Sequence, residues 1–304
     1  MSAHPSLSSV DAVVASLAEH DYLADRGLAT TIFLAASLNR PLFLEGEAGV
    51  GKTEVAKVLA AITGGELIRL QCYEGIDANQ ALYEWNYTAQ LLHLRTAEAT
   101  GVASADSADS LEEELFSERF LVRRPLLQAI DHRGEVPPIL LIDEIDRADD
   151  EFEAFLLEAL SDFSITIPEL GTFTATSPPL VIITSNRTRD VHDALKRRAL
   201  HHWVDHPSFE REVAILRAKA PDVPERLAHQ TALATGVVRE LGMYKPPGVA
   251  ETLDWANAMH LLGETELTEE TIDATLGTLL KYREDQDKVR REGLKHLLAA
   301  VAGA

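Results

Sequence analysis

The stretch FLEGEAGVGKTEVAKVLA, residues 43–60, decides the fold. An apolar run precedes a glycine-rich turn and a segment with apolar residues at helical spacing, which predicts a strand, a loop and a helix. The turn has the pattern G-x-x-x-x-G-K-[ST], in which consecutive backbone N–H groups surround phosphate oxygens at the positive end of the helix. We call residues 46–53 the glycine loop and expect it to bind nucleotide phosphates.

The residues of such a loop have different expected roles. Lys52 should reach the β- and γ-phosphates, and the hydroxyl of Thr53 should ligate Mg²⁺. Glu47 and Ala48 need no particular side chain, because the backbone alone makes the contacts there. The expected nucleotide-binding residues are Gly46, Glu47, Ala48, Gly49, Val50, Gly51, Lys52, Thr53, Glu54 and Asp143.

A second segment, ILLIDEID at residues 139–146, predicts a buried strand that ends in Asp143 and Glu144. Ligands of open α/β sheets bind at the carboxyl ends of the strands. We expect Asp143 to hold Mg²⁺ with Thr53, and Glu144 to act as the general base on a water that attacks the γ-phosphate. We call Asp143 and Glu144 the acidic pair. A carboxylate base directly beside a metal ligand favours an enzyme that hydrolyses the nucleotide over a protein that only switches with the nucleotide it binds.

Two further segments carry candidate catalytic residues. VIITSN, residues 181–186, predicts another buried strand, and Asn186 at its end could orient the attacking water. ALKRRAL, residues 194–200, places Arg197 and Arg198 at the end of a predicted helix. This arginine pair is either a surface basic cluster or the source of an arginine that enters a neighbouring subunit's site and neutralises charge in the transition state.

The alternation of apolar strands and helical segments predicts an α/β fold whose parallel sheet is covered by helices on both faces. Further strands are expected at 66–71, 178–186 and 201–207, and the small, polar and acidic residues 96–115 predict a flexible surface loop. The expected parts are N-terminal helices over residues 1–40, a nucleotide-binding core over 41–207 with a hairpin insert at 165–176, and an all-α lid domain over 208–304.

Composition excludes several classes of protein. With 28 Lys and Arg against 49 Asp and Glu, the net charge of −21 repels a phosphate backbone and counts against nucleic-acid binding. Cys72 is the only cysteine, so an intrachain disulfide is impossible and a reducing compartment is expected. No signal-peptide pattern and no run of 18 apolar residues is present, which predicts a cytoplasmic protein without a membrane span.

In this order and spacing, the four segments resemble the core of the AAA+ ATPases. Within that superfamily the chain is similar to the MoxR group. The segments that carry this similarity are LEGEAGVGKTEVAK, LIDEIDRAD, the insert ITIPELGTFTA directly before VIITSN, and ALKRRALHHWVDHP. RLQCYEGIDANQALYEWNY also resembles a MoxR segment, and the combination is most similar to the CoxD-like branch, with NorQ/CbbQ-type activases as relatives. The resemblance covers about residues 25–285.

The resemblance implies a P-loop AAA+ core with a lid, and a homohexameric ring that binds ATP and Mg²⁺ between subunits. It also implies a partner with a von Willebrand factor A domain and a metalloenzyme client, which for CoxD-like members is a molybdenum-containing carbon monoxide dehydrogenase. Glu144 and Asn186 match the base and sensor 1, and we favour Arg198 over Arg197 as the arginine finger. The lid lacks the usual sensor 2 arginine. Lys245 is the nearest cation there, and Arg123 or Arg124 could substitute from elsewhere.

Several alternatives stay open. The chain could be a NorQ/CbbQ-type activase of another enzyme, or a nucleic-acid-acting AAA+ motor, although its charge disfavours the latter. A P-loop GTPase or kinase is disfavoured because no NKxD-type motif is present and a kinase needs neither the arginine pair nor a helical lid. Tyr83, Trp85 and Tyr87 share a period-2 face, which predicts a β ribbon that belongs to the core or grips a client.

Overall fold

The computed structural model describes residues 4–99 and 108–302, and the chain divides into two compact units. The first unit comprises Met1–His4, Thr31–Leu44 and Leu59–His201, and the second comprises Pro5–Thr30, Glu45–Val58 and His202–Ala304. Each unit has its own apolar core. The domain borders expected near residues 41 and 208 stay a prediction.

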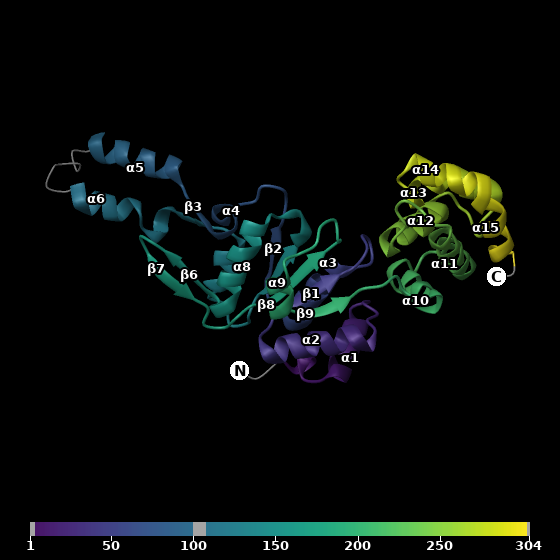
Figure 1. The fold of residues 1–304 in the computed structure, drawn as a ribbon, viewed down its shortest axis with the longest axis horizontal. Helices are drawn as coiled ribbons and strands as arrows, with labels where there is room; N and C mark the ends of the chain where they lie inside the picture. The colour runs from purple at the N-terminus through teal and green to yellow at the C-terminus, as the bar shows by residue number, and fades with distance from the viewer. Residues whose placement is uncertain (1–3, 100–107, 303–304) are drawn as a thin grey trace. The chain divides into compact units, whose positions relative to one another are not determined.

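A five-stranded parallel sheet with the order β2-β5-β8-β1-β9 forms the centre of the α/β fold. The central strand β5, Ile139–Asp143, is buried at every position and pairs in parallel with β2, Leu67–Gln71, and β8, Leu180–Ser185. The other strands are β1, Leu42–Glu45, and β9, Leu200–Trp203. Helices flank this sheet (Figure 1), which confirms the fold class that the continuous apolar runs predicted.

The helices of the α/β fold follow the strands in alternation. They are α2, Arg26–Leu38, α3, Lys52–Thr63, α7, Pro125–Ile130, α8, Asp150–Asp162, and α9, Asp193–Arg198. Leu126 of α7 and Leu156 of α8 belong to the same buried apolar cluster as Leu140 of β5. Apolar residues of α7 and α8 therefore pack in one core with the central strand.

Between β2 and β5 the chain forms an insert of helices and a two-stranded ribbon. Its elements are α4, Ala78–Leu82, β3, Tyr83–Trp85, α5, Tyr87–Ala99, α6, Ala108–Leu115, the short η3, Glu118–Phe120, and β4, Leu121–Arg123. The surface loop expected at 96–115 is wrong at both ends, because 96–99 belong to α5 and 108–115 to α6, while 100–107 lie outside the described residues. Ala, Glu and Leu in these segments favour helix.

The aromatic ribbon is shorter than the sequence predicted. β3 pairs antiparallel with β4, but Tyr87 begins α5 instead of continuing the strand. Trp85 is buried and its ring contacts the ring of Phe116 edge-on. Of the three aromatic residues, Trp85 therefore belongs to the core. A second ribbon, β6, Ser164–Ile167, with β7, Gly171–Thr174, is the hairpin that the alternating pattern predicted.

Beyond β9 the described residues of the second unit form helices and no strand, and two more of its helices lie near the start of the chain. Its helices are η1, Pro5–Leu7, α1, Val10–Glu19, α10, Phe209–Lys219, α11, Glu225–Glu240, α12, Val249–Leu261, α13, Glu269–Leu279, α14, Arg283–Lys288, the π-helical η5, Val289–Gly293, and α15, Leu294–Val301. Trp255 is fully buried at the centre, where its Nε1 donates to Thr275 Oγ1 at 2.8 Å. None of the described helices combines the length and apolar character that crossing a bilayer requires.

Candidate active site

The glycine loop closes around the ammonium group of its own lysine. Lys52, the first residue of α3, is 5% exposed, and its Nζ donates to the carbonyl oxygens of Gly46 at 2.8 Å and Glu47 at 2.6 Å. Gly49 and Gly51 have φ values of 80° and 93°, in the left-handed region that glycine adopts without strain. A buried cation inside a loop of this backbone conformation fits the phosphates of a nucleotide.

Helix α12 of the same unit contacts the glycine loop directly. The carbonyl oxygen of Gly49 accepts hydrogen bonds from the N–H groups of Val249 at 3.0 Å and Ala250 at 3.3 Å. A Cβ added to Gly248 would lie 2.7 Å from the Cα of Gly49, closer than a side chain tolerates. The loop and the start of α12 are therefore in backbone contact, and glycine is needed at 248 for that approach.

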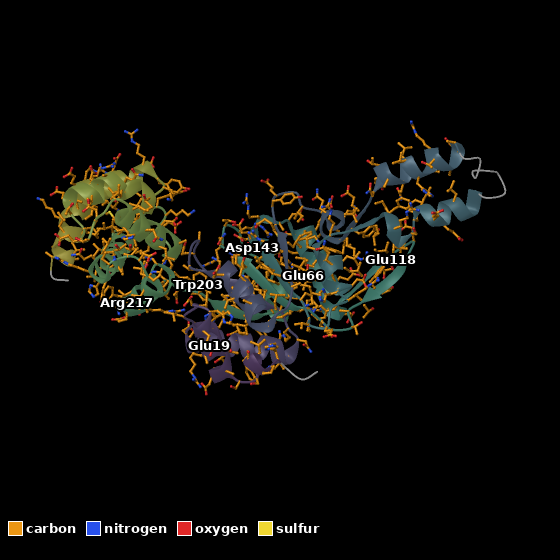
Figure 2. The ribbon with its side chains drawn as sticks, turned by 180° about the vertical axis from the view of Figure 1, so that it is seen from behind. Glu19, Glu66, Glu118, Asp143, Trp203 and Arg217 are labelled. Carbon is orange, nitrogen blue, oxygen red and sulfur yellow. The ribbon has the colours of Figure 1, made fainter. Side chains whose placement is uncertain are left out.

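Asp143, labelled in Figure 2, is the last residue of β5 and Glu144 follows it. The Asp143 side chain is buried, and both of its carboxylate oxygens accept hydrogen bonds. Oδ1 accepts a hydrogen bond from Thr184 Oγ1 at 2.6 Å, and Oδ2 accepts two from the Arg69 guanidinium at 2.6 and 3.1 Å. Carboxylate and hydroxyl oxygens such as those of Asp143 and Thr53 are the ligands that Mg²⁺ prefers. The side chain of Arg69 is 53% exposed, so its guanidinium can move away from the Asp143 carboxylate and lose little buried surface.

Glu144 and Asn186 lie side by side, as the sequence predicted. Asn186 Nδ2 donates to Glu144 Oε1 at 3.4 Å, and Glu144 Oε2 accepts from Gln71 Nε2 at 3.1 Å. The backbone of Glu144 is left-handed, with φ 56°, and its N–H donates to Thr184 Oγ1 at 2.9 Å. Such a conformation is uncommon for a residue with a side chain and occurs at functional sites. The structure thus brings the two residues together, and their catalytic roles stay a prediction.

A buried aspartate holds the loop that carries Asn186. Asp146, in the 3₁₀ turn η4, Ile145–Arg147, accepts from Asn186 N at 3.1 Å, and from Thr188 N at 2.8 Å and Thr188 Oγ1 at 2.7 Å. Sequence reasoning missed the residues that support the acidic pair and Asn186. They are Arg69, Gln71, Asp146 and Thr184. Two of the four, Gln71 and Thr184, are polar residues near the ends of predicted strands, and this pattern could have identified them from the sequence.

Cys72 follows β2 directly and lies near the carboxylates of the acidic pair. Burial, with the negative charge of Asp143 as the next cause, raises the pKa of the Cys72 thiol to about 12. Because the thiolate is the nucleophilic form, this cysteine is chemically inert near neutral pH. Cys72 is therefore no candidate nucleophile of the site.

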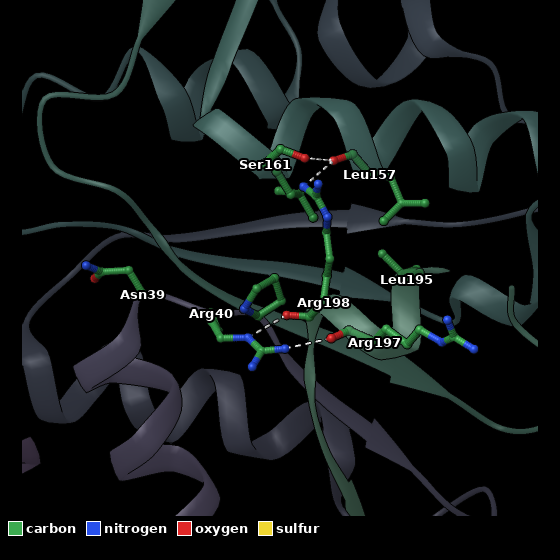
Figure 3. Close-up of a pocket in the computed structure, with 9 residues that line it drawn as sticks. Asn39, Arg40, Leu157, Ser161, Leu195, Arg197 and Arg198 are labelled. Carbon is green, nitrogen blue, oxygen red and sulfur yellow. Dashed lines mark hydrogen bonds between the residues drawn. The ribbon is translucent and has the colours of Figure 1, made fainter. Parts of the chain in front are cut away.

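The arginine pair ends helix α9 beside a pocket of about 310 Å³ (Figure 3). The Arg198 side chain runs toward α8 and donates to the carbonyl oxygen of Leu157 at 3.4 Å. The Arg197 side chain points the other way, and its guanidinium makes no hydrogen bond or ion pair with any residue that the structure describes. Both side chains are exposed to solvent.

The family model described as the AAA domain (dynein-related subfamily) matches residues 41–199, just over half of the chain. The chain belongs to this family. The matched range of the AAA domain contains the glycine loop, the acidic pair, Asn186 and the arginine pair.

Two solved structures resemble this AAA domain protein. The RuvB Holliday junction branch migration motor of Thermotoga maritima is 16% identical, with a TM-score of 0.45, and the match covers 90% of this chain and 79% of that chain. A Cytophaga hutchinsonii protein titled as an ATPase is 14% identical, with a TM-score of 0.44, and the match covers 97% of this chain and 96% of that chain.

The cations considered as replacements for a lid arginine have other partners in this AAA domain protein. Arg123 pairs with Glu118 at 2.8 Å and Asp131 at 3.0 Å, and Arg124 pairs with Glu84, all within the insert between β2 and β5. A role of Arg123 or Arg124 at the nucleotide would require these ion pairs to break, and it stays a prediction. Lys245 is exposed just before α12, where its N–H donates to Asp285.

Proposed function

We propose that this chain hydrolyses ATP with Mg²⁺ in a homo-oligomeric ring. The observation that carries the proposal is the contact of Glu144 with Asn186, directly after the buried Asp143. The acidic pair closes a strand of the parallel sheet, and ligands of open α/β sheets bind at the carboxyl ends of the strands.

In this proposal the glycine loop binds the phosphates through its backbone N–H groups and the Lys52 ammonium. Thr53 and Asp143 hold Mg²⁺, which when bound neutralises part of the phosphate charge. For Lys52 to reach a phosphate, its hydrogen bonds to the carbonyl oxygens of Gly46 and Glu47 must be exchanged for bonds to the ligand. The other binding positions of the loop contribute only backbone.

Glu144 accepts the proton of the attacking water, and its carboxylate is aimed by the hydrogen bonds from Asn186 and Gln71. An arginine of the adjacent subunit neutralises charge that develops on the γ-phosphate. The choice within the arginine pair stays open. Arg198 matches the family pattern, whereas Arg197 is the residue whose guanidinium has no partner among the described residues.

For the biological role we propose a MoxR-type, CoxD-like ring, a homohexamer that remodels or matures a metalloenzyme client. The proposed client is a molybdenum-containing carbon monoxide dehydrogenase, and the proposed partner is a von Willebrand A-domain protein. The AAA domain match and the hairpin β6–β7 directly before β8 support this reading. The alternative is a NorQ/CbbQ-type activase of another enzyme. Molybdenum content of a carbon monoxide dehydrogenase co-expressed with this chain would separate the two.

The variant Glu144→Gln tests the hydrolytic role. Removing the base should lower kcat by about 10²-fold or more while binding of a fluorescent ATP analogue is retained, because general-base catalysis contributes about that much. Glu151→Gln is the matched control, since Glu151 is an exposed residue in the first turn of α8. Hydrolysis by Glu144→Gln at the wild-type rate would show that Glu144 is not the base.

A further inference from the structure

Arg40 links the start of β1 to the end of helix α9. It lies between α2 and β1, and its guanidinium donates to three consecutive carbonyl oxygens (Figure 3). Nε donates to Arg198 O at 2.9 Å, and Nη2 donates to Arg197 O at 2.7 Å and to Ala199 O at 3.4 Å. The last carbonyls of a helix have no partner within the helix and attract a cation. Arg40 therefore caps α9 from a distant part of the sequence.

The segment that Arg40 holds has little support of its own. Helix α9 has only six residues, and a helix this short is not stable by itself. Next to the cap, the carbonyl oxygen of Pro41 accepts the N–H of Leu200 at 2.7 Å, so the two chain segments are joined at consecutive residues. The backbone position of the arginine pair thus depends on contacts with residues 40 and 41.

We propose that Arg40 is a positioning residue for ATP hydrolysis in the neighbouring subunit. The inference rests on the proposed function, in which one member of the arginine pair enters that neighbour's site. By fixing the carbonyls of Arg197 and Arg198, Arg40 sets the direction in which both guanidinium groups leave the backbone. The planar fork of arginine reaches several acceptors at once, whereas a lysine ammonium at position 40 would act as a point donor.

The variant Arg40→Ala tests the positioning role. We expect kcat to fall by on the order of 10²-fold, the cost of misplacing a catalytic group by about 1 Å, with unchanged affinity for a fluorescent ATP analogue and unchanged oligomer size. Arg40→Lys should give an intermediate kcat. Arg26→Ala is the matched control, because Arg26 begins α2, the helix that precedes Arg40, and has a 73% exposed side chain. A wild-type kcat in Arg40→Ala, even with a lower melting temperature, would overturn the proposal.

A mixing experiment tests whether Arg40 acts on the neighbour's site. Lys52→Ala subunits should lack their own activity but keep an intact Arg40 and arginine pair, whereas Arg40→Ala subunits keep an intact nucleotide site. In an equal mixture, about a quarter of the sites combine an intact site with an intact neighbouring arginine, so about a quarter of the wild-type rate should return. The size of the mixed oligomer, measured in parallel, confirms that both variants fold and assemble.

The double variant Arg197→Ala/Arg198→Ala separates failure of this inference from failure of the proposed function. Each variant is mixed with Lys52→Ala. If the mixture with the double variant regains activity but the mixture with Arg40→Ala does not, the arginine pair acts on the neighbour's site and the role of Arg40 is refuted. If the double variant alone hydrolyses ATP at the wild-type rate, the proposed arginine function is wrong and the inference falls with it. Recovery of ATPase activity in both mixtures supports the action of the arginine pair on the neighbouring site and the positioning role of Arg40.

Discussion

His206 illustrates at the residue scale how burial sets a proton affinity. Neither ring nitrogen has a hydrogen-bond partner among the described residues. Burial is the main cause that lowers the pKa of His206 below its ordinary 6.5, and the positive charge of Arg239 adds to it. The carboxylates of Glu212, Glu47 and Asp205 act in the opposite direction without reversing the shift. The folded chain therefore holds this imidazole neutral.

The shift predicts a loss of stability in acid. Between the lowered pKa and 6.5 the unfolded chain binds the proton and the folded chain does not, so stability is complete above pH 6.5 and falls below it. Thermal melts of the wild type and His206→Asn at pH 7.5 and pH 5.5 measure the effect. The melting temperature of the wild type should fall more between pH 7.5 and pH 5.5 than that of the variant. An equal fall in both would contradict the lowered pKa of His206.

Single residues also show which parts of the site a sequence can predict. Lys52, Asp143 and Glu144 were predictable because each belongs to a local pattern whose chemistry depends on its immediate neighbours. The salt bridge of Arg69 with Asp143 was not, because these residues are 74 positions apart and meet only when β2 pairs with β5. Asp146 is missed for the same reason, since its partner Thr188 comes from a different strand end.

At the scale of elements, the contact between the glycine loop and helix α12 makes a specific prediction. Gly248→Ala should lower the free energy of unfolding by about 1–3 kcal/mol, because the added methyl group would overlap the backbone of Gly49 and force it to move. The φ of Gly248 is −82°, which alanine adopts readily, so backbone strain contributes nothing. The variant should also bind ATP more weakly, since the loop must shift.

Gly236→Ala is the control for this substitution. Gly236 lies within α11, and an added Cβ would meet nothing within 4 Å. Alanine in a helix interior should raise the free energy of unfolding by about 0.5–1 kcal/mol. Urea titrations of both variants measure the two effects. Equal changes in Gly248→Ala and Gly236→Ala would show that close packing at 248 is not the cause.

The elements themselves were predictable where burial was continuous. β5 is buried at all five positions, so its apolar run could only be a covered strand or a core helix, and its length favoured the strand. A strand was expected over 201–207, but β9 ends at Trp203. Val204 still donates its N–H to the carbonyl oxygen of Glu45 at 2.8 Å, and Pro207 has no N–H with which the pairing could extend further. Tyr87 was misplaced because alternation in YEWNY continues past the point where α5 begins.

At the scale of the whole molecule, net charge disfavours a motor that acts on nucleic acid. The excess of acidic residues, 49 against 28 basic, gives a charge of −21. A protein that binds DNA through phosphate contacts releases counterions, and its affinity falls by about 10³–10⁵ between 50 and 200 mM salt when it makes 6–10 such contacts. A surface of this net charge instead repels the duplex over most of its area.

We therefore expect no binding to nucleic acid under conditions that favour it. Fluorescence anisotropy of a labelled duplex and of a labelled single strand, titrated with the Glu144→Gln variant and ATP at 50 mM salt, should show no saturable change. This variant is chosen because it should keep ATP bound and the ring assembled, the state in which a nucleic-acid motor holds its substrate. Saturable binding whose logarithm of affinity falls linearly with the logarithm of salt concentration would instead favour the nucleic-acid motor, because that slope counts the phosphates neutralised.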